Sequence, residues 1–320
     1  MTLSFSVSAN AQKRKKALVI LSSASELPLS LPEGESISTG VFTVELVKFL
    51  EEFEKKGFDF IFASPEGKKP TIDINGFDLR FYQTGMRAPF FQASPEKLSD
   101  NDKTYSRRYQ ELITSWKYLG SLNLSEALPN TAQSSIYFEK FIKEKQSKIA
   151  FDDKEFRSLK SITVDGISEY DMVYIPGGHA PMVDMKDNPA LGEVLNMFHE
   201  EKKLIAAICH GPIALHSLNY GLDEEGNEYK RELFPLKDFK ITTVSKSEEL
   251  FVLKHKYPKV PGSKTRLTYF VNEELEKTGF DVEYSVFLGL PRVVQDRHII
   301  TGNGPQAIDQ LVKKIIQYYE

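Results

Sequence analysis

Residues 204–212 read LIAAICHGP, and this stretch decides the predicted fold. Its first five residues are all apolar, as in a strand that is buried on both faces of a parallel sheet. Cys209 follows directly, and Gly211 and Pro212 lead into an apolar stretch at 213–220 that we expect to be helical, since proline suits a first helical turn. A residue at such a turn lies at the carboxyl end of the sheet, where open α/β folds bind their ligands.

The sequence on both sides of this turn alternates between strand and helix patterns. Short apolar runs predict strands at residues 17–21, 58–63, 172–175, 239–244, 282–286 and 298–301. Helical spacing of apolar residues predicts helices from about 42 to 57, which Ser38 or Thr39 can cap, and at 189–201, 267–278 and 305–319. We therefore predict a flavodoxin-like α/β fold: a doubly wound, mostly parallel sheet with helices on both faces and a nucleophile elbow at Cys209.

The domain organisation is predicted to be one domain over residues 16–320. From about 76 to 166 the sequence is richer in Lys, Ser, Gln and aromatic residues and has only weak helical stretches, such as 109–118 around Trp116. We expect a mostly helical insertion there, which either covers a cleft or adds a layer with no catalytic part. Residues 1–15 are expected to be a disordered tail or a signal-peptide remnant, because 3–11 (LSFSVSANA) ends in small residues.

Composition points to a small-molecule partner. The net charge of -4 gives no general attraction to nucleic acid or anionic lipid, and no run reaches the roughly 20 apolar residues of a membrane helix. A single cysteine excludes an intrachain disulfide, which favours the cytoplasm, with the periplasm as the alternative if the N-terminus is a truncated signal. Nucleic-acid and membrane partners are therefore not expected.

Cys209 is the candidate nucleophile. A helix N-terminus and a neighbouring imidazolium both lower a thiol pKa, so we expect a substantial thiolate fraction at neutral pH. The competing interpretation is a small, buried, inert cysteine. Gly177 and Gly178 end the preceding strand, and their N–H groups, with that of His210, are candidates for an oxyanion hole; a plain tight turn is the alternative.

A reacting thiol needs a proton donor and acceptor within reach. His210 is the nearest candidate base. Glu45 lies in an apolar stretch (VFTVELV), where burial would raise its pKa and let it carry a proton; a solvated surface glutamate is the alternative. Glu248 and Glu249 follow the strand predicted at 239–244, and either is a candidate to orient His210, unless both form a solvated acidic pair.

Four segments together resemble the ThiJ/PfpI superfamily, a group similar to class I glutamine amidotransferases. They are 175–179 (IPGGH), 207–212 (AICHGP), 38–45 (STGVFTVE) and 301–305 (TGNGP). Within the superfamily the chain looks closest to the branch of heat-shock chaperones and glutathione-independent glyoxalases. The resemblance covers about 16–64 and from 165 to the C-terminus, and leaves the expected insertion unmatched.

The resemblance implies roles for individual residues. Cys209 becomes the nucleophile, His210 its partner and Glu45 the carboxylate beside the sulfur, with Glu248 or Glu249 completing the triad. Gly178 and His210 become the backbone oxyanion donors, and His179 belongs to the same substrate-binding turn. Some relatives carry a metal site made from histidines upstream of the elbow; the first histidine here is His179, so no metal is expected. The resemblance also implies a homodimer.

The implied reaction converts methylglyoxal to lactate through a hemithioacetal on Cys209, with Glu45 moving a proton between adjacent carbons and without a cofactor. Protein repair or chaperone activity accompanies it in this interpretation. Two other classes stay open: a cysteine-dependent amidase or peptidase, because the same groups serve acyl transfer, and a stress holdase or redox sensor.

Overall fold

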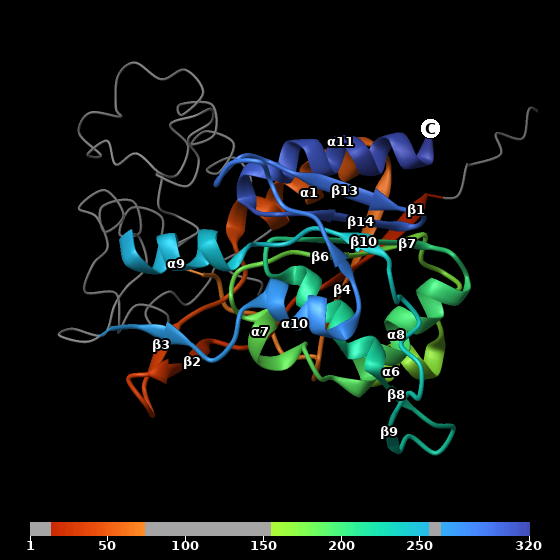
Figure 1. Ribbon diagram of the computed structural model, residues 1–320. Coiled ribbons are helices and arrows are strands. Elements are labelled where there is room, and N and C mark those ends of the chain that lie inside the picture. The colour runs from red at the N-terminus through yellow and green to blue at the C-terminus, as the bar shows by residue number, and fades with distance from the viewer. Residues whose placement is uncertain (1–13, 74–154, 256–263) are drawn as a thin grey trace, which may run out of the picture.

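A seven-stranded sheet forms the centre of the molecule (Figure 1). The computed structural model describes residues 14–73, 155–255 and 264–320. The strand order is β13-β14-β7-β6-β1-β4-β5. The strands span β1 Lys15–Ile20, β4 Phe58–Ser64, β5 Phe156–Ser158, β6 Met172–Ile175, β7 Leu204–Ile208, β13 Val293–Asp296 and β14 Ile299–Gly302. All neighbouring pairs are parallel except β13 with β14. The predicted doubly wound, mostly parallel fold is confirmed.

Helices cover both faces of this sheet. In Figure 1, α1 (Thr43–Lys55) and α11 (Ile308–Tyr319) lie on one side, and α6 (Leu159–Asp165), α8 (Pro189–Glu200) and α10 (Val271–Thr278) lie on the other. Residues on both faces of β6 and β7 are buried, which explains why these strands are wholly apolar. No helix among the described residues is long and apolar enough to cross a membrane.

Short elements complete the described part of the chain. Three small sheets pair β2 (Glu26–Leu31) with β3 (Ser36–Ser38) and β11 (Arg266–Leu267), β8 (Tyr220–Leu222) with β9 (Glu228–Lys230), and β10 (Lys240–Ile241) with β12 (Asp281–Val282). The remaining helices are α7 (Pro181–Asp184), α9 (Lys246–His255) and the 3-10 helices η4 (Gly211–Asn219) and η5 (Pro305–Ala307).

Several predicted elements are corrected in detail. The helix after the elbow is the 3-10 helix η4. The strands predicted at 239–244 and 282–286 are reduced to β10 and β12, which pair outside the main sheet. Helix α1 begins after Phe42 without a side-chain cap, because Ser38 belongs to β3.

Most of the expected insertion at about 76–166 lies outside the described residues. Residues 1–13 of the expected tail at 1–15 also lie outside them. Residues 155–166 are described, and they belong to the sheet: β5 pairs in parallel with β4, and α6 follows. Residues 155–166, expected in the insertion, therefore belong to the main domain.

One contact fixes helix α1 against the sheet and thereby positions the candidate site. Phe49 of α1 stacks on Tyr174 of β6 with ring centroids 3.8 Å apart. The Tyr174 hydroxyl donates a hydrogen bond of 2.8 Å to the main-chain oxygen of Glu45. The first turn of α1 is thus anchored to the strand that leads into the Gly177-Gly178 turn.

Candidate active site

Cys209 occupies a strained turn between β7 and η4. Its φ is 61°, a left-handed conformation that costs a residue with a side chain about 1–3 kcal/mol. Surrounding groups hold it there: the Cys209 N–H donates to the Gly302 oxygen at 2.9 Å, and the Cys209 oxygen accepts from the Thr243 hydroxyl at 2.6 Å. A Cβ at Gly211 would lie 2.4 Å from the Ile175 oxygen, so only glycine fits after His210. The chain therefore builds a nucleophile elbow at the predicted position.

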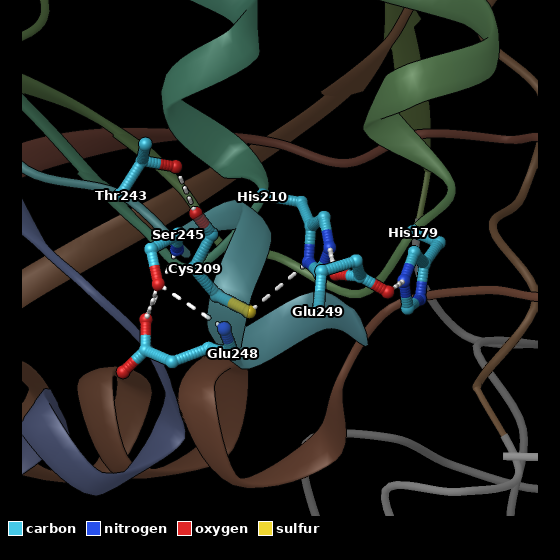
Figure 2. A network of polar contacts seen from close by, with 7 residues as sticks. All are labelled: His179, Cys209, His210, Thr243, Ser245, Glu248 and Glu249. Carbon is cyan, nitrogen blue, oxygen red and sulfur yellow. Dashed lines mark hydrogen bonds and ion pairs between the residues drawn. The ribbon is translucent and has the colours of Figure 1, made fainter. Parts of the chain in front are cut away.

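His210 and Glu249 extend from the sulfur in a line (Figure 2). The Cys209 Sγ lies 3.2 Å from His210 Nδ1, and His210 Nε2 lies 2.7 Å from Glu249 Oε2. Burial alone would raise the pKa of the Glu249 carboxyl, but His179 and His210 pull it well below its usual range, so this carboxylate only accepts. His210 Nε2 therefore carries a hydrogen, and in the neutral ring Nδ1 is the acceptor for the thiol proton.

His179 binds the second oxygen of the same carboxylate. Its Nε2 lies 2.7 Å from Glu249 Oε1, and the side chain is 1% exposed. The His179 and His210 rings are 4.0 Å apart, between centroids. His179, predicted to be a substrate-binding residue of the turn, is thus joined to the candidate triad through Glu249.

Glu248 points away from this line. Its Oε2 accepts from the Ser245 N–H and hydroxyl at 3.0 Å, and its Oε1 accepts from the Gly289 N–H at 3.1 Å. Figure 2 shows Glu248 beside Ser245, whereas Glu249 lies between the two histidines. Between the two glutamates that the sequence left open, the geometry favours Glu249 as the third triad member; Glu248 holds the loops around the site.

Glu45 is the buried carboxyl beside the sulfur. It is completely buried, its Oε2 accepts the Gly177 N–H at 2.8 Å, and this oxygen and the Cys209 Cβ both lie against Gly177. Burial raises the pKa of Glu45 to about 8, although the Gly177 N–H and Cys209 act in the opposite direction. Glu45 is therefore a protonated acid at neutral pH, and the solvated-surface alternative is wrong.

The two glycines before His179 have different roles. Burial raises the pKa of the Cys209 thiol, whereas the backbone N–H groups of Gly178 and His210 act to lower it, and both stay the predicted oxyanion donors. The Gly177 N–H is taken by Glu45, so it is not an oxyanion donor here. Gly178 has a φ of 88°, and a Cβ there would lie 2.0 Å from the Gly40 oxygen. The turn therefore requires glycine for both conformation and space.

The protonation state of the sulfur differs from the prediction. Burial, followed by the charge of Glu45, raises the pKa of the Cys209 thiol well above its ordinary value, and Glu249 adds to this. Burial, followed by the charge on His179, lowers the pKa of His210 to about 4. The expected depressed thiol pKa is wrong, because burial and the two carboxyl groups outweigh the short 3-10 helix. Cys209 and His210 instead form a neutral thiol–imidazole pair.

A small cavity opens onto this group. Its volume is about 60 Å³, room for a few heavy atoms given that one water molecule needs roughly 10–15 Å³ of such space. Besides Cys209, the two histidines and the two neighbouring glutamates, its lining consists of Phe42, Val244, Val252, Gly289 and residues 303–306. Cys209 is 7% exposed, so the sulfur is buried but lines a reachable cavity.

Two histidines and a carboxylate also have the composition of a zinc site, and the ligand atoms of His179, His210 and Glu249 lie within 4.8 Å of one another. Each Nε2, however, faces a carboxylate oxygen at 2.7 Å, the spacing of a direct hydrogen bond. An ion between them would need about 2 Å to each partner. We assign the three residues to hydrogen bonding.

Sequence reasoning missed two residues of the site. Asp73, 1% exposed, acts electrostatically on both Glu45 and His179. Thr243 holds the carbonyl of the elbow. Asp73 ends a short polar stretch with no periodic pattern, so no sequence signal marks it. Thr243 belongs to the strand predicted at 239–244, which does point at this end of the sheet.

The fold and the site define a class: an α/β protein with a cysteine at a nucleophile elbow and a histidine–glutamate pair beside it. The DJ-1/PfpI family model matches residues 141–225. The deglycase HchA of Escherichia coli O1:K1, described as a protein/nucleic acid deglycase, is 29% identical over 167 residues, 51% of this chain and 53% of the relative. The chain therefore spans about half the length of the curated relatives it matches.

Solved structures show the same fold. Glyoxalase III from Candida albicans superposes with a TM-score of 0.56 at 19% identity, covering 96% of this chain and 98% of that one. The 24 kDa rapid encystment protein of Francisella tularensis gives 0.54 at 18% identity, covering 95% and 98%. The family-model match and the related deglycase support the predicted placement in the ThiJ/PfpI superfamily.

Proposed function

We propose that this protein is a cofactor-independent glyoxalase that converts methylglyoxal to lactate through a hemithioacetal on Cys209. One observation carries the proposal: a completely buried carboxyl group that is protonated at neutral pH, Glu45, borders the same turn residue, Gly177, as the nucleophilic Cys209. Moving a proton between two adjacent carbons requires such a group, whereas acyl transfer by a cysteine hydrolase does not. The matched deglycase and the glyoxalase III structure support the same class of reactive carbonyl chemistry.

The first step forms the hemithioacetal. His210 Nδ1, 3.2 Å from the sulfur, takes the thiol proton as sulfur attacks the aldehyde carbon. The N–H groups of Gly178 and His210 stabilise the developing oxyanion, which then takes the proton of Glu45. Glu45 is left as a carboxylate and His210 as an imidazolium.

The second step moves the proton. The Glu45 carboxylate removes the proton from the carbon bonded to sulfur, while His210 protonates the neighbouring ketone oxygen, giving an enediol. Glu45 returns its proton to the neighbouring carbon, and His210 recovers a proton from the hydroxyl on the carbon bonded to sulfur. The product is a lactoyl thioester, and water cleaves it to lactate and the free thiol. Methylglyoxal and one water are consumed for each lactate.

The cavity is consistent with this substrate class. A cavity of about 60 Å³ suits a triose-sized dicarbonyl rather than a folded protein as the substrate. A larger adduct, such as the glycated groups named for the related deglycase, would place only its carbonyl-derived end at Cys209. Protein repair at this site would follow the same thiol addition.

The test compares two variants of the full chain. Cys209→Ala should remove lactate formation from methylglyoxal completely. Glu45→Gln should keep a thiol that iodoacetamide alkylates, yet form lactate at least about 100-fold more slowly, because the proton carrier is gone. Glu52→Gln, at a partly exposed position of the same helix where Glu52 pairs with Lys48, is the matched control and should behave as wild type.

Two results would overturn the proposal. One is full lactate formation in Glu45→Gln. The other is a wild-type protein that forms no lactate but cleaves amide or ester substrates with equal rates in wild type and Glu45→Gln, which would establish a cysteine hydrolase.

A further inference from the structure

Glu249 is shared between two imidazoles, and only one of them touches the sulfur. His210 lies 3.2 Å from Cys209 Sγ and 2.7 Å from Glu249 Oε2, while His179 lies 2.7 Å from Glu249 Oε1. All three side chains are almost fully buried, so water does not screen their charges. Figure 2 shows the carboxylate between the two rings. Which of the two histidines carries a proton determines whether His210 can act as a base toward Cys209.

We propose that His179 is a positioning residue: it carries the proton that neutralises Glu249, and it thereby keeps His210 neutral with its Nδ1 lone pair directed at the thiol of Cys209. His179 extends the triad to a fourth member that does not contact the reacting atoms. This assignment rests on the proposed function only in taking Cys209 as the nucleophile.

Geometry supports the assignment first. A buried carboxylate with both oxygens within 2.7 Å of an imidazole nitrogen needs two N–H donors, but its single charge balances only one imidazolium. The two rings are 4.0 Å apart, so two adjacent cations would repel each other strongly. One histidine is therefore charged and the other neutral.

The surroundings decide which histidine is charged. Glu249 faces His179 from α9, and Asp73 and Glu45 act on it from other segments. Burial disfavours the charged form of His179, but Glu249 and Asp73 overcome it and raise the pKa of His179 above its ordinary value. For His210, burial and the charge of His179 outweigh Glu249 and lower the pKa to about 4. The proton therefore resides on His179.

The arrangement has a consequence for the chemistry. With His210 already protonated, no base would be available for the thiol proton. A neutral His210, oriented by the Glu249 carboxylate, receives that proton only as the sulfur attacks. His179 thus delays formation of the thiolate until substrate is present and leaves the resting cysteine as a thiol.

The first experiment uses the wild-type protein. Nitrogen NMR of histidine-labelled protein distinguishes charged from neutral rings, and His179→Gln and His210→Gln assign the two signals among the six histidines. At pH 7 we expect His179 to be an imidazolium and His210 to be neutral with hydrogen on Nε2. A neutral His179 beside a charged His210 would overturn the proposal.

The second experiment measures the alkylation of Cys209 by iodoacetamide against pH, which needs no substrate and reports on the chain's one cysteine. His179→Gln keeps a donor for Glu249 but removes the positive charge, so His210 accepts a proton more readily and the thiolate–imidazolium form gains population. The alkylation midpoint should move to lower pH by about one unit, which is about a tenfold faster reaction below the wild-type midpoint.

The control is His298→Gln, which replaces a buried histidine that hydrogen-bonds to another histidine, His199, away from the site. Its alkylation midpoint should equal that of wild type. An unchanged or raised midpoint in His179→Gln would show that His179 has a structural role only. Because alkylation is independent of methylglyoxal, a shifted midpoint without lactate formation would contradict the glyoxalase proposal and leave the role of His179 intact.

Discussion

The described residues contain two pairs of adjacent histidines, at opposite ends of the parallel strands. At the carboxyl ends, His179 and His210 are joined through Glu249. Before strand β14, His298 hydrogen-bonds directly to His199 at 3.1 Å, with Arg297 next to it in sequence. Burial, followed by the charges of His199 and Arg297, lowers the pKa of His298 to about 4.

The difference between the pairs is one carboxylate. Burial, with the nearby charge of Arg297, keeps the imidazoles of His298 and His199 neutral. A buried carboxylate between two imidazoles retains one proton and orients both rings. The same two residue types are therefore inert at one end of the sheet and able to transfer protons at the other.

Glu249→Gln should have the largest effect, because it makes the first pair resemble the second. The neutral amide offers one acceptor oxygen in place of two, so His210 loses its orientation and the support for its imidazolium. Lactate formation should fall by about 10²–10⁴, the range typical of general acid–base catalysis. The rate constant for methylglyoxal turnover, measured beside calorimetry to confirm folding, tests this. A decrease of less than about tenfold would mean that Glu249 is not part of the catalytic group.

Glu45→Gln should raise stability at alkaline pH. The folded-state pKa of Glu45 is about 8 against an ordinary 4.5, so the folded protein holds a proton that the unfolded chain has lost. Wild type therefore loses stability as the pH rises from about 4.5 to about 8, by on the order of 5 kcal/mol. The amide has nothing to ionise and still accepts the Gly177 N–H.

Calorimetry at pH 5 and pH 9 measures this difference. The Glu45→Gln variant should be the more stable protein at pH 9 while lacking activity, and Glu52→Gln should follow wild type. If wild type and Glu45→Gln lose the same stability between the two pH values, the raised pKa of Glu45 is wrong.

His298→Gln should reduce the acid sensitivity of the fold. The pKa of His298 is about 4 in the folded protein and 6.5 in the unfolded chain. Between these pH values the unfolded chain binds a proton that the folded protein does not bind. Stability therefore falls as the pH drops from about 6.5 to 4. One such group changes the free energy of unfolding by at most about 1.4 kcal/mol per pH unit. The change is smaller here because solvent reaches His199 and screens the charges. Near the active site, the raised pKa of His179 partly offsets the lowered pKa of His210.

Urea unfolding at pH 4.5, 5.5 and 6.5 should therefore show a shallower slope for His298→Gln than for wild type. Equal slopes would place the acid-sensitive groups elsewhere in the chain.

The sequence predicted the architecture well, because buried parallel strands are continuous apolar runs: β6 and β7 have the predicted bounds. Cys209, His210 and Glu45 were identifiable from their places beside such strands. The sequence did not separate Glu248 from Glu249, since adjacent residues on a helix differ only in direction, and direction depends on how α9 packs. It also could not show that His179 and His210 share one carboxylate, because that contact joins segments 70 residues apart.

Charge states were the least predictable property. A helix N-terminus beside a histidine indicated a low thiol pKa, but the outcome depends on burial and on Glu45, which comes from a distant helix. Local sequence gives the residue types of a site, whereas the balance of charge among them depends on the tertiary structure.

Thr243→Val should have the smallest effect, and it tests how firmly the elbow is held. The Thr243 hydroxyl donates to the Cys209 oxygen at 2.6 Å, and valine keeps the shape but not the donor. Loss of one buried hydrogen bond should cost about 1 kcal/mol of stability and slow Cys209 alkylation a few-fold, because the left-handed turn loses a support.

Thr242→Val is the matched control. The Thr242 hydroxyl donates to the main-chain oxygen of Glu283 at 2.7 Å, away from the elbow. Thr242→Val should therefore lose about as much stability as Thr243→Val. Urea unfolding and the alkylation rate together separate the two effects: only Thr243→Val should change the sulfur's reactivity. Equal alkylation rates in the two variants would mean that the Val244 N–H and the Gly302 oxygen, which also bind the Cys209 backbone, are sufficient to hold the strained conformation.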